Sequence, residues 1–201
     1  DGKLLKSSTI FIRNDEGIYV DRIIDAHSPI VIFRGQTTLD ATIPQLMAFL
    51  FDPRTQVEWN DTAYESQIIE KISETEVFFY SAMRVPWPFR DRDFLLKLET
   101  DINPRARSLT VRGVETVHPR ALPHPQRVRL PVSRVAWQLA ALGKKTRVIV
   151  TFQLDPGGIL PLWIMNKVTR GMPYKALRNI RRVISQQKYD PAYERRFSKF
   201  A

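Results

Sequence analysis

The sequence predicts an α+β fold in which a curved antiparallel sheet of about nine strands wraps around one long C-terminal helix. Three observations lead to this prediction. Strand-like runs fill most of the chain up to residue 154, two short helical stretches follow the third of them, and one long amphipathic helix occupies the last third. The strands alternate polar and apolar side chains, so the sheet has one apolar face that needs a cover, and only the last helix is long enough to supply it.

The first elements form a meander followed by two short helices. Strands are expected over Ser7 to Arg13 and Ile18 to Ile24, around the turn sequence at 14–17, and a third over Pro29 to Leu39. Helical spacing of apolar residues then predicts a helix over Ala41 to Phe51, and Pro53 opens a second one over 52–59.

Strands resume after these helices and continue to the last turn. The expected runs are Glu65 to Ile72, Glu76 to Val85, Asp93 to Thr100, Arg107 to Val117, Val132 to Ala141 and Lys145 to Leu154. Alternation is clearest at Phe94, Leu96 and Leu98, and again at Val148, Val150 and Phe152. The long Pro-rich connection at 118–131 is a candidate for the rim of an opening.

The last helix is expected from Pro161, which suits a first turn, to about Gln187. Its apolar side carries Leu162, Met165, Thr169, Met172, Ala176, Leu177, Ile180, Val183 and Ile184. Its other side carries Lys167, Arg170, Lys175, Arg178, Arg181 and Arg182, with Trp163 and Tyr174 nearby. Gly171 and Pro173 predict a kink in the middle.

Composition favours one domain over 1–201, with a core at about 10–187 and a basic tail at 188–201. Residues 1–115 hold 14 Lys and Arg against 18 Asp and Glu, whereas residues 116–189 hold 14 against one. The second half therefore faces anions, and charge alone leaves anionic lipid and nucleic acid open as partners. The chain has no cysteine and no apolar run long enough to span a bilayer. Because it begins at Asp1, we expect that an upstream piece was removed, and localisation stays open between export and the cytoplasm.

Two motifs together resemble the START (steroidogenic-acute-regulatory-protein-related lipid-transfer) domain family. They are Val85-Pro86-Trp87-Pro88-Phe89-Arg90-Asp91-Arg92-Asp93-Phe94 and the stretch Asp155-Pro-Gly-Gly-Ile-Leu-Pro-Leu-Trp-Ile-Met-Asn, with Trp59-Asn60 and the order of elements in support. The resemblance runs from about Ile10 to Ile184, and only residues 1–6 stand where the family has its first helix. It implies a helix-grip fold that encloses a tunnel for one lipid molecule, such as a sterol or phospholipid, with the last helix as lid.

The expected tunnel lining combines alternate sheet residues with the apolar side of the lid. The candidate lipid-binding residues are Phe78, Tyr80, Ala82, Arg84, Phe94, Leu96, Leu98, Trp137, Val148, Val150, Phe152, Met165, Thr169, Met172 and Leu177. Ala82 and Leu98 stand where some relatives carry an acid–base pair, so Arg84 with Tyr80 is the remaining candidate for an internal polar anchor. A solidly packed core is the alternative.

Membrane docking is expected through the lid, which would meet anionic lipid with Trp163, Lys167, Arg170, Tyr174, Lys175, Arg178, Arg181 and Arg182. The three histidines have no carboxylate or cysteine at ligand spacing, so neither a metal, a cofactor nor a catalytic set is assigned. The chain lacks a nucleic-acid recognition motif as well. The leading hypothesis is a non-enzymatic lipid-transfer domain, and the alternative is a cyclase or hydrolase of the helix-grip superfamily that acts on a polyketide or aromatic substrate.

Overall fold

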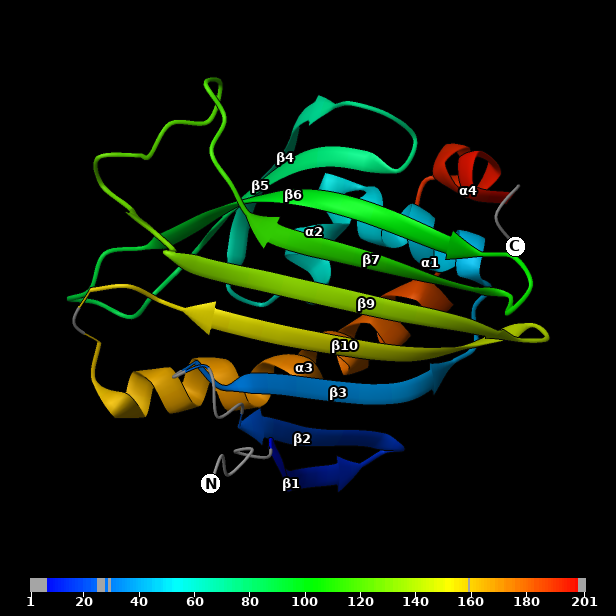
Figure 1. The fold of residues 1–201 in the computed structure, drawn as a ribbon, viewed down its shortest axis with the longest axis horizontal. Helices are drawn as coiled ribbons and strands as arrows, with labels where there is room; N and C mark the ends of the chain where they lie inside the picture. Colours follow the sequence, from blue (N-terminus) through cyan, green and yellow to red (C-terminus); the bar gives the residue numbers. More distant parts are fainter. Residues whose placement is uncertain (1–6, 25–27, 29, 159, 199–201) are drawn as a thin grey trace, which may run out of the picture.

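The computed structural model describes residues 7–24, 28, 30–158 and 160–198, without the side chains of 162, 163 and 165–170. One large sheet makes up most of the fold, with the strand order β1-β2-β3-β10-β9-β7-β6-β5-β4. Each strand in this order is antiparallel to its neighbours (Figure 1). The nine strands on the path are β1 (Ser8–Asp15), β2 (Ile18–Ile24), β3 (Ile32–Leu39), β4 (Ala63–Lys71), β5 (Glu76–Met83), β6 (Arg92–Asn103), β7 (Ser108–Glu115), β9 (Val132–Leu142) and β10 (Lys145–Asp155). The predicted sheet of about nine strands is confirmed. A two-residue bridge, β8 (Val128–Arg129), adds a short parallel pairing to β6.

Two short helices follow β3, as predicted, and each begins at a strong cap. Helix α1 (Ile43–Phe51) starts with a reciprocal capping box between Thr42 and Gln45, and α2 (Pro53–Trp59) starts where the Asp52 carboxylate accepts a hydrogen bond from the Arg54 amide. Proline in the first turn of each helix removes a donor that would be unpaired there anyway. Both helices lie on the same side of the sheet as α3 (Figure 1).

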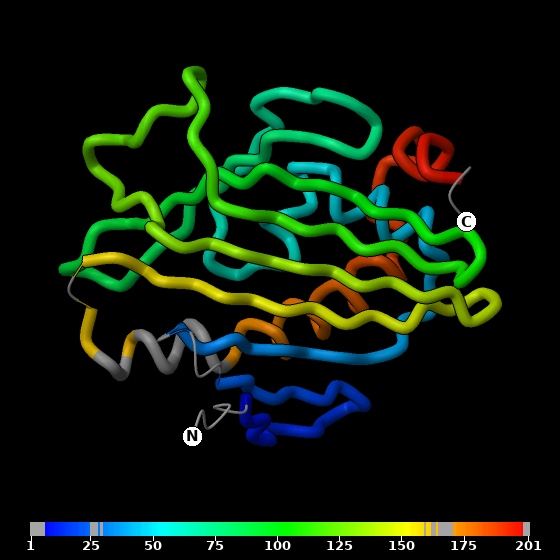
Figure 2. Tube along the Cα trace, in the orientation of Figure 1, coloured from blue at the N-terminus to red at the C-terminus, as the bar shows by residue number. Residues whose placement is uncertain are grey.

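Helix α3 (Leu162–Ser185) crosses this covered face and continues unbroken through Gly171 and Pro173 (Figure 2). Its C-terminal half packs closely on β3 at Gly35, where an added Cβ would lie 2.9 Å from both Leu177 Cδ1 and Pro173 Cβ. A glycine is therefore required for this approach. None of the described helices is both long and apolar enough to cross a membrane.

The segment predicted as a basic tail contains a further helix, α4 (Pro191–Phe197), which packs on α1. Phe197 is fully buried, with its ring centroid 5.3 Å from that of Phe51. Arg196 Nε donates to Glu74 Oε2 at 2.6 Å, which ties α4 to the β4–β5 turn. The tail is thus held by the body of the protein rather than freely available to a membrane.

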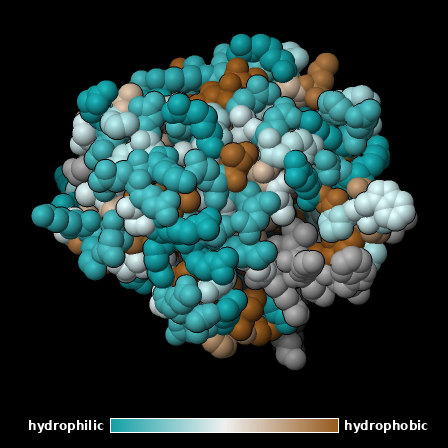
Figure 3. Space-filling model, turned by 180° about the vertical axis from the view of Figure 1, so that it is seen from behind, coloured by the Kyte–Doolittle hydropathy of each residue, from teal (hydrophilic) through white to brown (hydrophobic). Residues whose placement is uncertain are grey.

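Seen from behind, the surface is mainly hydrophilic, with small apolar patches (Figure 3). One patch lies at the end of the molecule that carries the β5–β6 loop, residues 84–91. Trp87 in this loop is 92% exposed, the largest exposed fraction among the described large apolar side chains.

Candidate ligand-binding cavity

A cavity of about 500 Å³ lies between the covered face of the sheet, α2 and α3. Most of its lining is apolar, and the sheet contributes alternate residues of five strands. Its walls are formed by Leu50, Phe51, Gln56, Trp59, Phe79, Met83, Phe94, Leu96, Leu98, Val111, Ser133, Val135, Trp137, Phe152, Leu154, Met172 and Ala176. The volume and the mixture of many apolar with few polar groups are typical of a small-molecule site.

The strand register explains which side chains face the cavity. Phe79 on β5 pairs with Leu96 on β6, and Ser81 pairs with Phe94, so odd-numbered residues of β5 share a face with even-numbered residues of β6. Phe94, Leu96 and Leu98 therefore point inward as predicted, next to Phe79. Of the candidate lipid-binding residues, those that line the cavity or its mouth are Arg84, Phe94, Leu96, Leu98, Trp137, Phe152 and Met172.

Phe78, Tyr80 and Ala82 do not line the cavity, which corrects the predicted lining. They are the even-numbered residues of β5 and project to the opposite face of the sheet. There Phe78 packs on His118, while Tyr80 and Ala82 form a separate buried cluster with Leu95 under the loop that follows β7.

Tyr80 belongs to a buried polar cluster on that outer side. Asp93 has no exposed surface; its carboxylate accepts from Tyr80 Oη at 3.0 Å and from Arg129 Nε at 2.8 Å. Arg127 donates to Tyr80 Oη at 2.5 Å and forms an ion pair with Glu65 at 2.7 Å. Burial and the nearby Asp93 charge raise the pKa of Tyr80 to about 12. The cluster fastens the Pro-rich loop to the sheet, so Tyr80 is not an anchor inside the tunnel.

Three other candidate lining residues lie beyond the cavity in solid packing. Val148 and Val150 on β10 are 1% and 0% exposed and sit in the main core, and Leu177 is fully buried against β3. The packed core that was the alternative prediction is therefore present at this end of the sheet. The side chains of Met165 and Thr169 lie outside the described residues.

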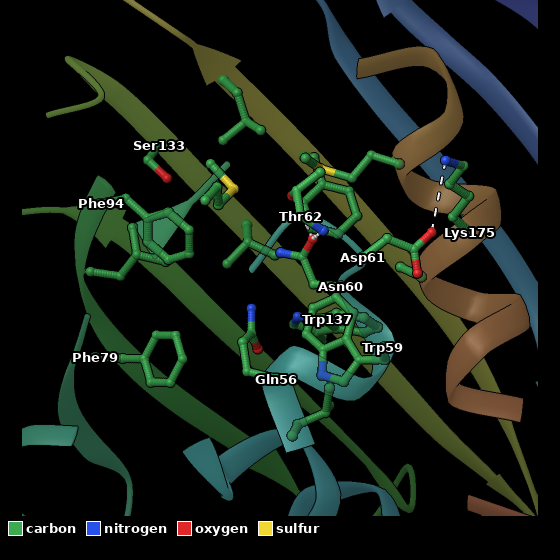
Figure 4. A pocket seen from close by; sticks show the side chains of 18 of the residues that line it. Gln56, Trp59, Asn60, Asp61, Thr62, Phe79, Phe94, Ser133, Trp137 and Lys175 are labelled. Carbon is green, nitrogen blue, oxygen red and sulfur yellow. Dashed lines mark hydrogen bonds and ion pairs between the residues drawn. The ribbon is translucent and has the colours of Figure 1, made fainter. Parts of the chain in front are cut away.

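The cavity reaches the surface at a polar opening, called here the mouth, formed by Asn60, Asp61, Thr62, Arg84, Val85, Pro86 and Lys175. Lys175 Nζ lies 3.8 Å from Asp61 Oδ2, so an ion pair joins α3 to the α2–β4 loop at this point (Figure 4). Asn179 Nδ2 also donates to Asp61, at 2.8 Å. Arg84, predicted as an internal anchor, is exposed here and its guanidinium lies 5.4 Å from the ring centroid of Tyr64.

Two polar residues of the cavity wall, Gln56 and Trp59 on α2, are not among the predicted site residues. They are three residues apart and therefore share one face of the helix. Both are buried, and Trp59 Nε1 has no hydrogen-bond partner in the described structure. A glutamine on the inner face of a short helix, one turn before a tryptophan, is the signal that could have revealed them.

Two of the predicted docking residues on α3, Tyr174 and Arg181, are bonded to the first β-hairpin. Tyr174 is 5% exposed and its hydroxyl donates to Asp15 Oδ2 at 3.1 Å, under the Arg13 guanidinium. Arg181 is pinned to the first hairpin through the Glu16 carbonyl at 2.8 Å. These two residues are covered by β1 and β2, so a docking role for Tyr174 is wrong.

The remaining docking residues are less constrained. Arg178 and Arg182 are exposed, and Lys175 lies at the mouth. The side chains of Trp163, Lys167 and Arg170 lie outside the described residues. No cluster of three or more His, Cys, Asp or Glu able to hold a metal ion occurs among the residues that the structure describes.

Comparison with known proteins identifies the family. The START domain family model matches residues 10–189. An uncharacterized protein of Pseudomonas aeruginosa is 22% identical, with 90% of this chain covering 88% of that protein. The phosphatidylcholine transfer protein of Rattus norvegicus is 24% identical, with 78% of this chain covering 75% of it. The structure of a STAR-related lipid transfer protein fragment from Xanthomonas axonopodis superposes with a TM-score of 0.78 at 25% identity, covering 89% of this chain and 99% of that one.

Proposed function

Because the chain belongs to the START domain family, we propose that it binds one lipid molecule in the cavity and transfers or presents it between membranes. Family members with a stated role among its relatives are lipid transfer proteins, and one is named for phosphatidylcholine. The hollow between the sheet and α3 is the observation that carries the proposal. A cavity of about 500 Å³ with aromatic and aliphatic walls is unfavourable to leave empty or to fill with water, because neither gives those walls contacts.

Exchange of the lipid would take place at the mouth. The β5–β6 loop contributes Arg84, Val85 and Pro86 to it and carries the exposed Trp87 directly after them. Indole rings favour the boundary between lipid head groups and chains, and nearby cations favour anionic lipid. We therefore place the membrane-facing surface at this loop and the adjacent part of α3, rather than along the whole cationic side of α3.

The Lys175–Asp61 ion pair would act at the same place. Both side chains are about half exposed, so the pair contributes little to stability and can open at low cost. Its separation would free α3 from the α2–β4 loop and widen the mouth. A membrane bearing negative charge would favour this step by competing for Lys175.

An enzymatic role has weaker support. The ionisable side chains in the lining are Asp61, Arg84 and Lys175, all at the mouth, and Asp61 is held there by Lys175 and Asn179. No carboxylate or histidine faces the interior from the described residues, so general acid–base chemistry on an enclosed substrate has no evident donor or acceptor.

A transfer assay tests the proposal. Donor vesicles carry a lipid labelled with a self-quenching fluorophore, acceptor vesicles are unlabelled, and transfer is followed as dequenching with and without the protein. We expect transfer that rises with protein concentration and is faster with anionic than with zwitterionic acceptors. The matched charge reversals are Arg84→Glu in the β5–β6 loop at the mouth and Arg105→Glu in the β6–β7 turn at the far end of the sheet (Figure 1). Only the first is expected to slow transfer; equal effects of the two would contradict the assigned surface, and no transfer of any lipid would contradict the function.

A further inference from the structure

A group of unpaired hydrogen-bond donors lies inside the cavity. Trp59 is 6% exposed, and its Nε1–H, which can only donate, has no partner in the described structure. An unpaired donor in an apolar interior is destabilising, and native proteins keep few of them. The Trp59 Nε1 atom has almost no accessible surface, so a ligand in the cavity does not reach it, and the donors open to a ligand are those of its two neighbours.

Two neighbouring side chains also carry hydrogen-bond donors without a partner. Gln56 lies one turn earlier on the same face of α2 and is 7% exposed, and its side chain makes no hydrogen bond with the rest of the described chain. Trp137 on β9 is 6% exposed and meets Trp59 edge to face, with ring centroids 5.7 Å apart; its Nε1 is also without a partner among the described residues. Figure 4 shows the Gln56 amide in the open space between Phe79 and Trp137. The two residues whose donors are open to the cavity, Gln56 and Trp137, are called here the polar anchor.

The charges around the cavity indicate what the polar anchor can accept. The cations of the lining, Arg84 and Lys175, are at the mouth, and no cationic side chain is part of the wall near the anchor in the described structure. An anionic carboxylate or phosphate seated at the anchor would lose its hydration without gaining a counter-ion, which is strongly unfavourable. An uncharged carbonyl, ester or hydroxyl oxygen can accept from an indole N–H at no such cost.

The cavity volume limits the size of the ligand. An apolar cavity of about 150 Å³ holds benzene, so by the same ratio about 500 Å³ holds about 20 non-hydrogen atoms. A single acyl chain with a small head group has about this size. A diacyl phospholipid has more than twice as many atoms and does not fit the cavity as it stands.

We propose that the cavity selects an uncharged single-chain lipid whose ester, carbonyl or hydroxyl oxygen accepts hydrogen bonds from the Gln56 and Trp137 side chains, with its chain along Phe79, Phe94 and Leu96. This inference rests on the proposed lipid-binding function and adds the class of lipid and the residues that recognise its head group. The ligand thus differs from the two-chain lipid for which one relative is named.

The test is a competitive loading experiment on the full chain. Delipidated protein is incubated with zwitterionic vesicles that contain equal amounts of methyl palmitate and nonadecane, which have the same number of non-hydrogen atoms, and dipalmitoylphosphatidylcholine. The protein is then repurified, and the bound lipids are extracted and quantified by mass spectrometry. We expect methyl palmitate to exceed nonadecane about tenfold, and the phospholipid to be at background.

Substitutions then locate the selectivity. Trp137→Phe and Gln56→Leu each remove a donor and keep most of the apolar volume, so each is expected to lower the ratio of ester to hydrocarbon about fivefold or more. Using the ratio cancels the loss of chain contacts, which affects both ligands equally. Gln138→Leu is the matched control, since it makes the same change as Gln56→Leu at an exposed residue of β9 that is not part of the cavity wall. Circular dichroism and a urea titration establish that each variant is folded.

The outcomes separate the two proposals. Loading of lipid with an unchanged ratio in both anchor variants, or with preference for the phospholipid, overturns the inference and leaves the lipid-binding function standing. Absence of every lipid from the wild-type protein overturns both. A ratio that falls in the anchor variants and not in Gln138→Leu supports the polar anchor.

Discussion

Filling the cavity from the lid should stabilise the empty protein and exclude its ligand. Ala176 on α3 is 3% exposed and lines the cavity, so Ala176→Phe places six ring carbons in the hollow. By comparison with benzene, the ring takes about 150 Å³ of the space of about 500 Å³. Burial of the ring is expected to raise the free energy of unfolding by about 2 kcal/mol.

The same ring should displace about six non-hydrogen atoms of the ligand. At about 0.3 kcal/mol for each atom, the loss is about 2 kcal/mol, or roughly thirtyfold in affinity. Urea denaturation of the delipidated protein measures the first effect, and loading of methyl palmitate from vesicles measures the second. The control is Ala140→Phe, which puts an identical ring on the opposite face of the sheet, since Ala140 pairs with the exposed Arg147.

A solid core would not give a gain in unfolding free energy together with a loss of ligand affinity. An over-packed core is destabilised by about 1–3 kcal/mol when a large side chain is forced into it. A marked decrease in the stability of Ala176→Phe, together with wild-type loading, would therefore refute the existence of the hollow at this position.

Three further changes probe the supports of the cavity and its surface. Arg92 is 4% exposed, and its guanidinium donates hydrogen bonds to the carbonyls of residues 90, 156 and 157. Arg92→Met removes these bonds and should lower the unfolding free energy measured in urea by about 3 kcal/mol. A loss below about 1 kcal/mol would contradict the role of Arg92 in holding the β10–α3 linker. Lys71 and Arg196 donate hydrogen bonds to the Glu74 carboxylate and lower the pKa of Glu74 to about 2. The contribution of Glu74 to stability is therefore present above about pH 4.5 and is lost as the pH falls toward 2. Thermal denaturation across this range should show Glu74→Gln less stable than wild type at pH 7 and equal to it at pH 2, and a difference that persists at pH 2 would contradict the assignment. Trp87→Ser should lower cosedimentation with anionic vesicles about tenfold and leave the stability unchanged, because the indole is 92% exposed.

Two of these changes have matched controls. Arg112→Met removes an arginine whose ion pair with Asp101 spans 3.8 Å at the surface, and should leave stability within about 0.5 kcal/mol of wild type. Leu142→Ser removes an exposed apolar side chain from the β9–β10 end of the sheet and should leave vesicle binding intact. Equal losses in Trp87→Ser and Leu142→Ser would mean that general surface hydrophobicity, not the β5–β6 loop, controls binding.

The order of elements could be predicted from local patterns because each pattern has a local cause. Alternation along β6 and β10, the proline-started helices after β3 and the amphipathic α3 all appear in the structure where the sequence places them. The helix α4 was not predicted, because a helix of seven residues is too short to show a clear periodic pattern and its fold depends on the contact of Phe197 with Phe51, far away in the chain.

The inner face of β5 could not be assigned from alternation, since both of its faces are apolar. Phe79 faces the cavity, while on the other side Tyr80 is buried and Phe78 half-buried by the loop after β7. A strand that is covered on both faces lacks the polar residues that mark its outer side. Tyr174 was misplaced for a related reason: the first hairpin covers a side of α3 that its own sequence marks as polar.

The hollow itself was the least predictable feature. Val150 and Phe152 are two residues apart on the same face of β10, yet the first is packed in the core and the second lines the cavity. Their sequence pattern is the same, so alternation alone does not distinguish a packed position from one that lines a cavity. Only the family resemblance favoured a cavity over a packed core.

Native mass spectrometry of the protein equilibrated with a total lipid extract tests the central claim most directly. If the space between the sheet and α3 is a lipid site, the spectrum should show the chain with one added molecule, and dissociation should release an uncharged single-chain lipid of about 20 non-hydrogen atoms. A spectrum with only the bare chain, at every lipid concentration that leaves the protein folded, would contradict the account.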